Sequence, residues 1–403
     1  MGKQAGTPVS DWMRDFESIF CRHFDTPDEF IIGIGYMVAG SSLANRVFMR
    51  SPDELTTNLY LLLCSPPGWY HKSSPLRAAT RILRRILSPE EFIPSYASSE
   101  ALGKIISDSV DGNGRGHGII IYDEFRSFLA HIRKEYAANV GSLVVERFER
   151  GPDLQFVRKS RAKDDEPDGV IRDVIPGGYV LSFVASTTTP WLLESMKGSD
   201  ITGGMLSRFL LIEAHEKTRS RALPIPVEEK FLGHLAERLQ EVRKSYEGTE
   251  FQFSPTAASA FEMLYHDIEK TAMRHEYPEY PSLISRAPTY VKKMALINAA
   301  LRGGRSEILE EDLEEPAGIV VESIRSCERV VDEFVSWEGT YSKSLFKAKR
   351  ILASRRRIAK RDLLRMMHMR VRDLDEILES LSQQGLVLYE KEGRQEFILW
   401  RGV

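Results

Sequence analysis

Two short segments of the sequence carry residues whose types and spacing suit phosphate chemistry. The first is SPPGWYHKSS, residues 65–74, in which Lys72 and Ser73 stand where a helix is expected to begin. Backbone N–H groups at a helix start and a lysine ammonium bind phosphate oxygens, and a serine hydroxyl binds Mg²⁺. We therefore expect a nucleotide-binding loop with Mg²⁺ at Ser73. Its expected members are Gly68, His71, Lys72, Ser73 and Ser74.

This loop departs from the usual phosphate-loop pattern G-x-x-x-x-G-K-[ST]. Ser65 replaces the first glycine, the loop is one residue longer, and His71 replaces the last glycine. Trp69 and Tyr70 are bulky for a loop that wraps a phosphate. The alternative interpretation is an ordinary turn between a strand and a helix, with an exposed lysine.

The second segment, IIIYDEF at residues 119–125, reads as a buried strand that ends in Asp123 and Glu124. A carboxylate at a strand end can hold Mg²⁺, and a neighbouring glutamate can act as the general base that polarises an attacking water. Acids at the start of a helix also interact favourably with its dipole, which is the alternative. Because both segments follow buried strands and lie about 50 residues apart in the expected order, we predict one ATP and Mg²⁺ site.

Two further residues could complete such a site. Thr188 follows the third strand, and it can orient the hydrolytic water if that strand lies between the other two. Arg208, in GGMLSRFLLIEA at residues 203–214, precedes a fourth strand. An arginine there can cross a subunit boundary and stabilise charge on the γ-phosphate. The alternatives are helix capping by the threonine and a structural ion pair of the arginine.

Four short apolar runs alternate with helical patterns and would position these residues. The runs are Asn58–Cys64, Gly118–Tyr122, Tyr179–Ala185 and Phe209–Ala214. Continuous apolar strands that alternate with helices indicate an α/β core with a mostly parallel sheet. Helical patterns precede this core over residues 8–50 and follow it over 226–337, with a linker at 216–224. A hairpin is expected from Leu154–Lys159 and Val170–Ile175, with Lys159, Arg161 and Lys163 around its tip.

The composition excludes several classes of protein. The 403 residues are 42% hydrophobic and 28% charged, with a net charge of -3, which is ordinary for a soluble globular chain. Cys21, Cys64 and Cys327 lack the spacing of metal ligands, so we expect a reduced, cytoplasmic chain. No signal peptide and no membrane helix are expected.

Basic charge is concentrated near the C-terminus. Residues 343–372 contain twelve lysines and arginines and one acid, Asp362. Helices followed by two strands, Leu386–Glu390 and Glu396–Trp400, are typical of a winged helix-turn-helix. We therefore expect DNA contacts from Arg355, Arg356, Arg357, Lys360, Arg370 and Arg372.

The expected recognition helix, residues 371–384, is itself acidic, which argues against base reading through its centre. The alternative for the basic face is docking on an acidic surface such as Glu310–Glu315.

Taken in order, these motifs resemble the AAA+ core of the minichromosome maintenance helicases. They are more similar still to the helicase-like domains of phages and mobile elements, which often occur beside primases. The resemblance rests on the DEF segment, residues 123–125, and the LSRF segment, residues 206–209, and covers about residues 30–335. It implies an α/β fold with a P-loop AAA+ core, an α-helical lid and a C-terminal winged helix.

The resemblance also assigns roles by position. Lys72 and Ser73 would bind phosphate and Mg²⁺, and Asp123 and Glu124 would be the Walker B pair. Thr188 would replace the asparagine of sensor 1. Arg208 would be an arginine finger that acts on a neighbouring subunit, and Arg286 would be the sensor 2 arginine. Lys159, Arg161 and Lys163 would belong to a pore hairpin that grips DNA. A hexameric ring is the implied assembly.

Four parts follow: an N-terminal helical segment, an ATPase core, a helical lid and a winged-helix domain, over residues 1–50, 51–222, 223–340 and 341–403. The leading hypothesis is a DNA-associated ATPase of a phage or mobile element, a replicative helicase or helicase loader. One alternative is a degenerate, non-hydrolysing module that acts as an initiator or transposition regulator. A second alternative is a signalling ATPase whose winged helix only packs.

Overall fold

The computed structural model describes residues 11–401, except for 69, 113, 135–136, 160–169, 197–199, 201–203, 215, 224, 276–279, 384–385 and 393–394. The chain divides into two compact units, Met1–Arg329 and Val330–Val403. The first contains all of the predicted ATPase core and most of the predicted lid, and the second contains the end of the predicted lid and the predicted winged-helix domain.

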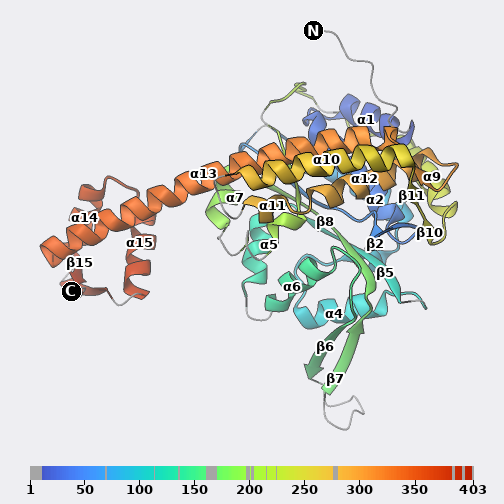
Figure 1. Ribbon diagram of the computed structural model, residues 1–403. Coiled ribbons are helices and arrows are strands. Elements are labelled where there is room, and N and C mark those ends of the chain that lie inside the picture. Colours follow the sequence, from blue (N-terminus) through green and yellow to red (C-terminus); the bar gives the residue numbers. More distant parts are fainter. Residues whose placement is uncertain are drawn as a thin grey trace. The chain divides into compact units, whose positions relative to one another are not determined.

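A five-stranded sheet, parallel throughout, lies at the centre of the first unit (Figure 1). Its strands, in spatial order, are β4 (Phe92–Ile93), β5 (Arg115–Tyr122), β8 (Gly178–Thr188), β3 (Tyr60–Ser65) and β9 (Leu210–Glu213). Four of them match the predicted apolar runs, so the predicted α/β core with a parallel sheet is confirmed. β4 was not predicted, because two residues are too short to show a pattern.

Helix α2 (Asp28–Leu43) packs against β3, β5, β8 and β9 and is buried on almost every side. Its close approach to the sheet depends on Gly40, where an added Cβ would lie 2.4 Å from the Thr57 carbonyl oxygen. The Thr57 hydroxyl also donates to the Gly40 carbonyl at 2.7 Å. A continuous apolar helix against a continuous apolar strand gives the core of the unit.

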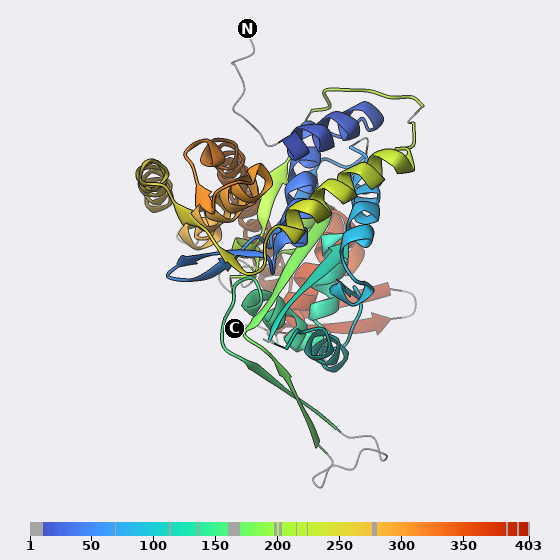
Figure 2. The ribbon, with the colours of Figure 1, turned by 90° about the vertical axis from the view of Figure 1, so that its right-hand side faces the viewer.

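The remaining helices of the first unit surround this core (Figure 2). Helices α1 (Asp11–His23), α3 (Ser73–Ile86) and α9 (Glu229–Lys244) pack on α2. Helix α9 also packs on α1 and α3. Helix α5 (Phe125–Ile132) packs on β5 and β8. The predicted lid region supplies α10 (Pro255–Arg274), α11 (Tyr280–Ile284), α12 (Ala287–Arg302) and the start of α13 (Glu311–Arg355).

The prediction of helix through residue 50 was wrong at its end. Val47–Ser51 forms strand β1, which pairs antiparallel with β2 (Asp53–Thr56) and parallel with β10 (Thr249–Glu250). The predicted helical region 226–337 likewise contains β10, β11 (Gln252–Phe253) and β12 (Glu307–Ile308). These strands are short and pair with partners distant in sequence, so no local pattern indicates them.

The predicted hairpin is confirmed with the predicted bounds, β6 (Leu154–Lys159) and β7 (Val170–Ile175), and extends away from the sheet (Figures 1 and 2). Arg161 and Lys163 lie outside the described residues, and Lys159 ends β6. Its base is held firmly. The buried Arg147 side chain donates to the carbonyls of Pro152 and Ile175 at 3.0 and 3.2 Å.

The two backbones also touch directly at the base of the hairpin. The Gly151 N–H donates to the Gly177 carbonyl at 3.1 Å, and a Cβ added at Gly177 would lie 1.8 Å from the Gly151 oxygen. Only glycine therefore allows this close approach.

The second unit has a three-stranded antiparallel sheet in the order β13-β15-β14. Its elements after α13 are β13 (Arg357–Ala359), α14 (Lys360–Met367), α15 (Val371–Gln383), β14 (Val387–Glu392) and β15 (Gln395–Trp400). The two predicted strands are confirmed, and β13 is additional. A separate apolar core, including Leu352, Leu363, Leu378 and Ile398, holds the unit together. In the described part of the chain, no helix has the length and apolarity to cross a membrane.

A buried lysine joins the predicted lid to the sheet. Lys293, on α12, is fully buried, and its ammonium donates to the Asn58 side-chain oxygen at 2.7 Å and to the Asn58 and Phe148 carbonyls at 3.1 Å each. The Asn58 amide in turn donates to the carbonyls of Phe148 and Leu181. Burial lowers the pKa of Lys293 to about 7.

This pKa predicts how stability depends on pH. Between about pH 7 and pH 10 the unfolded chain keeps a proton on Lys293 that the folded chain loses, so its contribution to stability rises with pH. The unfolding free energy of the native chain, relative to Lys293→Met, should rise by roughly 2 kcal/mol from pH 7 to pH 9 in urea titrations. The exposed Lys244→Met is the control and should show no such trend. The prediction would be contradicted if the difference in unfolding free energy between the native chain and Lys293→Met stays constant or falls from pH 7 to pH 9.

Candidate functional site

The carboxyl ends of the parallel strands meet at one edge of the sheet. Ser65, the last residue of β3, pairs with Thr188, the last residue of β8, and Tyr122 at the end of β5 pairs with Ala185. β8 therefore lies between the two strands that precede the predicted motifs, as expected. This edge brings the phosphate-loop candidate, the acidic pair and the polar end of β8 together.

Lys72 reaches across this edge. Its ammonium donates to the Ser65 hydroxyl and to the Thr187 carbonyl, both at 2.7 Å. Burial lowers its pKa. Lys72 directly precedes α3, where Ser73 and Ser74 are the first two residues. A lysine ammonium beside the first turn of a helix is a favourable position for phosphate oxygens.

Two of the described residues in the loop between β3 and α3 lie in the left-handed region. Gly68 has a φ of 111° and His71 a φ of 42°. His71 stands where the usual pattern has its last glycine, and a side chain in that conformation is strained by about 1 kcal/mol. Two contacts hold it there. The His71 ring Nδ1 lies 2.8 Å from an Asp25 carboxylate oxygen, and the Thr26 hydroxyl donates to the His71 carbonyl at 3.1 Å.

The segment predicted as a linker, residues 216–224, contacts the two residues that hold this loop, Asp25 and Thr26. The Lys217 ammonium donates to Asp25 at 2.5 Å, and the Arg219 guanidinium donates to the Thr26 carbonyl at 2.9 Å. Burial raises the pKa of Asp25, but hydrogen bonds from Lys217 and His71 outweigh it and lower the pKa overall. The turn before α2, the loop and this segment therefore form one charged cluster that fixes the loop.

The acidic pair lies beside the end of β8. Asp123 is exposed, and the Ser186 hydroxyl donates to its backbone carbonyl. Glu124 precedes the first residue of α5 in an extended conformation and is half-buried. Ser186 and Thr187 make the polar contacts to Asp123 and Lys72. Thr188 is half-buried at the same edge.

A further acid, Glu213, is the last residue of β9 and lies at the same edge of the sheet. The Glu213 side chain is almost fully buried, lies 3.4 Å from the Thr189 hydroxyl and forms an ion pair with Arg329 on α13 at 2.9 Å. The Thr189 hydroxyl also lies 3.5 Å from the Cys64 sulfur. Glu213, Asp25 and Lys217 were not predicted, because each contacts the site through residues distant in sequence.

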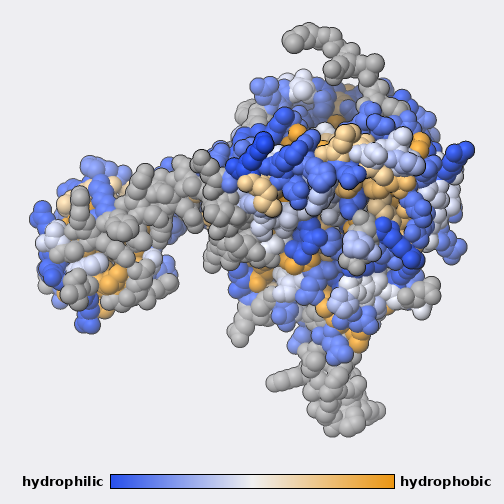
Figure 3. All heavy atoms as spheres, in the orientation of Figure 1, coloured by the Kyte–Doolittle hydropathy of each residue, from blue (hydrophilic) through white to orange (hydrophobic). Residues whose placement is uncertain are grey.

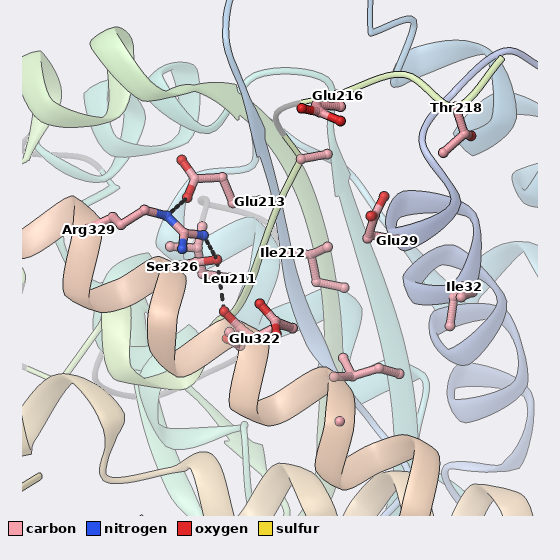
Figure 4. A pocket seen from close by; sticks show the side chains of 14 residues that line it. Glu29, Ile32, Leu211, Ile212, Glu213, Glu216, Thr218, Glu322, Ser326 and Arg329 are labelled. Atoms are coloured by element: carbon pink, nitrogen blue, oxygen red, sulfur yellow. Dashed lines mark hydrogen bonds and ion pairs between the residues drawn. The ribbon is translucent and has the colours of Figure 1, made fainter. Parts of the chain in front are cut away.

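A pocket of about 490 Å³ opens beside Glu213 (Figure 4). The edge strand β9 lies between α2 and α13, and the pocket is lined from all three. Ile32, Leu211, Ile212 and Ile319 give apolar surface, while polar groups are supplied by Glu29, Glu213, Glu216, Thr218, Glu322, Ser323, Ser326 and Arg329. The pocket adjoins the end of β3, because the Ala214 N–H donates to the Cys64 carbonyl at 3.1 Å.

Two predicted arginines lie at the opposite edge of the sheet. Arg208 precedes β9, and its guanidinium donates to the Gly204 carbonyl at 2.6 Å. Arg286 directly precedes α12 and pairs with Glu149 at 2.9 Å. Burial, and next the positive charge of Arg286, lower the pKa of Arg208. The Tyr290 N–H donates to the Arg286 carbonyl at 3.0 Å and the Tyr290 hydroxyl contacts the Arg208 carbonyl, so the two arginines are neighbours.

Both arginines are far from Lys72 within the chain. The hydroxyl of Tyr290, on α12, donates to the carbonyl of Tyr60 at 2.7 Å and also contacts the Arg208 carbonyl. Tyr60 begins β3 and Ser65 ends it, so about 16 Å of strand separates the arginines from the phosphate-loop edge. The structure does not bring Arg286 to the phosphate loop of its own chain.

The basic residues of the second unit differ in how they are engaged. Lys360 forms ion pairs with Asp375 at 2.8 Å and Glu396 at 3.1 Å, and Arg357 pairs with Glu390 at 2.9 Å. Arg372 lies 3.4 Å from Glu376. The remaining predicted contacts, Arg355, Arg356 and Arg370, are exposed.

The predicted Mg²⁺ site has only two expected protein ligands, Ser73 and Asp123. Among the described residues, no group of three or more His, Cys, Asp or Glu side chains is placed to hold a metal ion. Mg²⁺ needs no such group, since it is usually held by one or two carboxylates together with substrate phosphates and water. The exposed Asp123 and the serine that begins α3 suit that kind of site.

Comparison with known proteins leaves the family open. No protein-family model matches the sequence, and no curated protein matches it. The fold itself defines a class, an α/β protein with a five-stranded parallel sheet and polar residues gathered at the carboxyl edge.

The strain at His71 gives a prediction. Both His71→Ala and His71→Gly lose the contact with Asp25, but only glycine adopts the left-handed conformation freely. His71→Ala should therefore be less stable than His71→Gly by about 1 kcal/mol in urea unfolding. Equal stability, or a more stable alanine variant, would contradict a left-handed conformation at this position.

Proposed function

We propose that this chain is a P-loop ATPase of the AAA+ type that acts on DNA. The observation that carries the proposal is the position of Lys72. Lys72 directly precedes α3, and its ammonium contacts the ends of β3 and β8, while Asp123 and Glu124 follow β5, the strand beside β8. Phosphate binding requires a lysine at the start of a helix, and water activation requires acids near it. Here a single described strand, β8, lies between the strand that precedes Lys72 and the strand that precedes the two acids.

Each residue at the edge has a defined task in this proposal. Lys72 and the N–H groups that begin α3 would bind the phosphates, and Ser73 and Asp123 would hold Mg²⁺, which supplies charge neutralisation when bound. Glu124 would take a proton from the attacking water. Ser186 fixes the backbone of Asp123, and Thr188 would orient the water from the end of β8.

The pocket beside β9 supports a place for the nucleoside. Its volume of about 490 Å³ lies within the range of small-molecule sites. Ile32, Leu211 and Ile319 could pack on a purine, while Glu29 and Glu216 could accept hydrogen bonds from an amino group or ribose hydroxyls. Because the pocket adjoins Cys64 and Glu213 at the phosphate-loop edge, one ATP could span both.

The position of Arg208 and Arg286 supports action between subunits. They are neighbours, but they lie at the edge of the sheet opposite Lys72. They could therefore reach a γ-phosphate only on an adjacent copy, as expected of an arginine finger. A ring in which each copy completes the site of the next, such as a hexamer, satisfies this arrangement.

The DNA part of the proposal rests on two features. The β6–β7 hairpin extends from the first unit and carries basic residues in its sequence, and the second unit combines helices α14 and α15 with a three-stranded sheet, as a winged helix does. ATP hydrolysis coupled to hairpin movement would make the chain a replicative helicase or helicase loader of a phage or mobile element.

The loop sequence favours a second candidate, a nucleotide-binding module that does not hydrolyse ATP. His71 replaces a glycine, and the charged cluster with Asp25 and Lys217 fixes the loop. Such a module would act as an initiator or a regulator of transposition. Calorimetry with ATP and Mg²⁺ separates the candidates, since binding without turnover supports this one.

The ATPase proposal predicts the effect of two substitutions. Lys72→Ala should abolish ATP binding, and Glu124→Gln should keep binding but lower DNA-stimulated hydrolysis by about 100-fold or more. Phosphate release measures turnover, and calorimetry measures binding. Lys104→Ala, an exposed lysine paired with Asp108, is the control and should behave like the native chain. Hydrolysis that both substitutions leave unchanged would overturn the mechanism.

Action between subunits predicts complementation. Arg208→Ala and Lys72→Ala should each be inactive alone, because each lacks one half of every site. Mixed together, they should regain part of the activity, since some interfaces then pair an intact Lys72 with an intact Arg208. If mixtures never exceed the separate variants, while gel filtration shows that mixed assemblies form, Arg208 does not act on a neighbour.

A further inference from the structure

We propose that the second unit binds single-stranded DNA in a hollow formed by β13, α14, β15 and the start of α15, and not along the exposed acidic face of α15. The inference rests on the proposed action on DNA and specifies which strand form and which surface are used. The hollow has a volume of about 950 Å³. Basic and apolar side chains line it together, including Arg355, Arg357, Arg361, Arg365, Met366 and Phe397.

Three arginines give the hollow its positive charge. Arg355, Arg361 and Arg365 are exposed, and each lines it. Lys360 also lines it, but Asp375 and Glu396 hold its ammonium at 2.8 and 3.1 Å. Lys360 therefore serves to join α14 to α15 and β15, and phosphate binding falls to the arginines. Guanidinium groups suit phosphates because they can donate two parallel hydrogen bonds.

The wall of the hollow has a preformed stacking surface. The Arg357 guanidinium lies over the Phe397 ring, with its central carbon 3.8 Å from the ring centre. Glu390 holds the same guanidinium at 2.9 Å, so its plane is fixed. Unpaired bases stack on arginine planes and on aromatic rings, which paired bases inside a duplex cannot do.

Most of the remaining lining is apolar. Its acids are Asp362, which is exposed, and Glu396, which pairs with Lys360 at 3.1 Å. Met366 is 38% exposed and Val371 is 56% exposed, and both line the hollow above the buried Leu374. Exposed apolar side chains within a basic surface suit a partner that carries both phosphates and flat apolar faces. A single strand presents both, whereas a duplex presents mainly its phosphates to such a concave surface.

Helix α15 is a poor surface for a duplex. Asp373, Glu376 and Glu379 are exposed along it and would approach phosphates or base edges. Arg372 at its start already lies 3.4 Å from Glu376. Insertion of α15 into a major groove would therefore place acids against a polyanion, which costs affinity.

The test compares charge removal inside and outside the hollow, in the full chain without nucleotide, so that its result does not depend on ATP hydrolysis. Arg361→Gln with Arg365→Gln removes two charges from the hollow, and Arg370→Gln removes one at the start of α15, outside it. Fluorescence anisotropy measures binding of labelled oligo(dT) of about 30 nucleotides, of the matching duplex and of oligo(rU), over a salt series.

The native chain should bind oligo(dT) more tightly than the duplex. The double variant should lose about tenfold or more in affinity for oligo(dT). The slope of log K against log salt concentration should also be shallower than that of the native chain by about 1.4. Arg370→Gln should change the affinity less than twofold. A preference for the duplex, a larger loss from Arg370→Gln than from the double variant, or tenfold tighter binding of oligo(rU) would each overturn the proposal.

Photo-crosslinking locates the strand independently of these variants. Oligo(dT) with 5-iodouracil, irradiated on the native chain, should crosslink to Phe397 or Met366, identified by mass spectrometry of the peptides. Crosslinks confined to the part of α15 that follows Leu374 would overturn the proposal. This readout needs no substitution, so it remains decisive even if the double variant folds poorly.

Discussion

The parallel pairing of β3 with β8 is the constraint on which the rest of the first unit depends. Its register places Ser65 beside Thr188, so the loop after one strand and the polar end of the other share an edge. The Lys72 ammonium contacts both strands there. A shift of one residue would turn the side chains of β3 to the other face and separate these groups. The buried apolar runs that set the register therefore also position the chemistry.

The same parallel arrangement separates the two halves of the proposed site. Groups that follow strands gather at one edge, and groups that precede strands gather at the other. Lys72 and Asp123 belong to the first set, and Arg208 belongs to the second. Because about 16 Å of strand lies between them, no rotation of side chains can join the sets within one chain. Assembly is thus a requirement of the geometry under the proposed function.

The sequence predicted the parts of this fold whose signals are local. The runs that became β3, β5, β8 and β9 are continuous and apolar, and each is followed by a polar turn, so both the strands and the residues after them could be located. The hairpin was equally clear, because its strands are adjacent in sequence and flank a polar stretch.

The features that sequence reasoning missed depend on contacts between distant segments. β1 pairs with β10, Asp25 holds His71, and Glu213 meets Arg329, each across a long stretch of chain. Their residue types are ordinary, so no local pattern marks them. The basic segment shows the same limit. Its charge was evident, but only the fold distinguishes Lys360, held by two acids, from the exposed Arg361.

The base of the β6–β7 hairpin has a mechanical consequence. Arg147 and the contact between Gly151 and Gly177 clamp both strands where they leave the first unit, so the described part of the hairpin must turn as one piece with its base. Six residues of strand extend about 20 Å from that clamp. Such a lever converts a rotation of about 10° at its base into about 3.5 Å at its far end, close to the rise between successive base pairs of DNA.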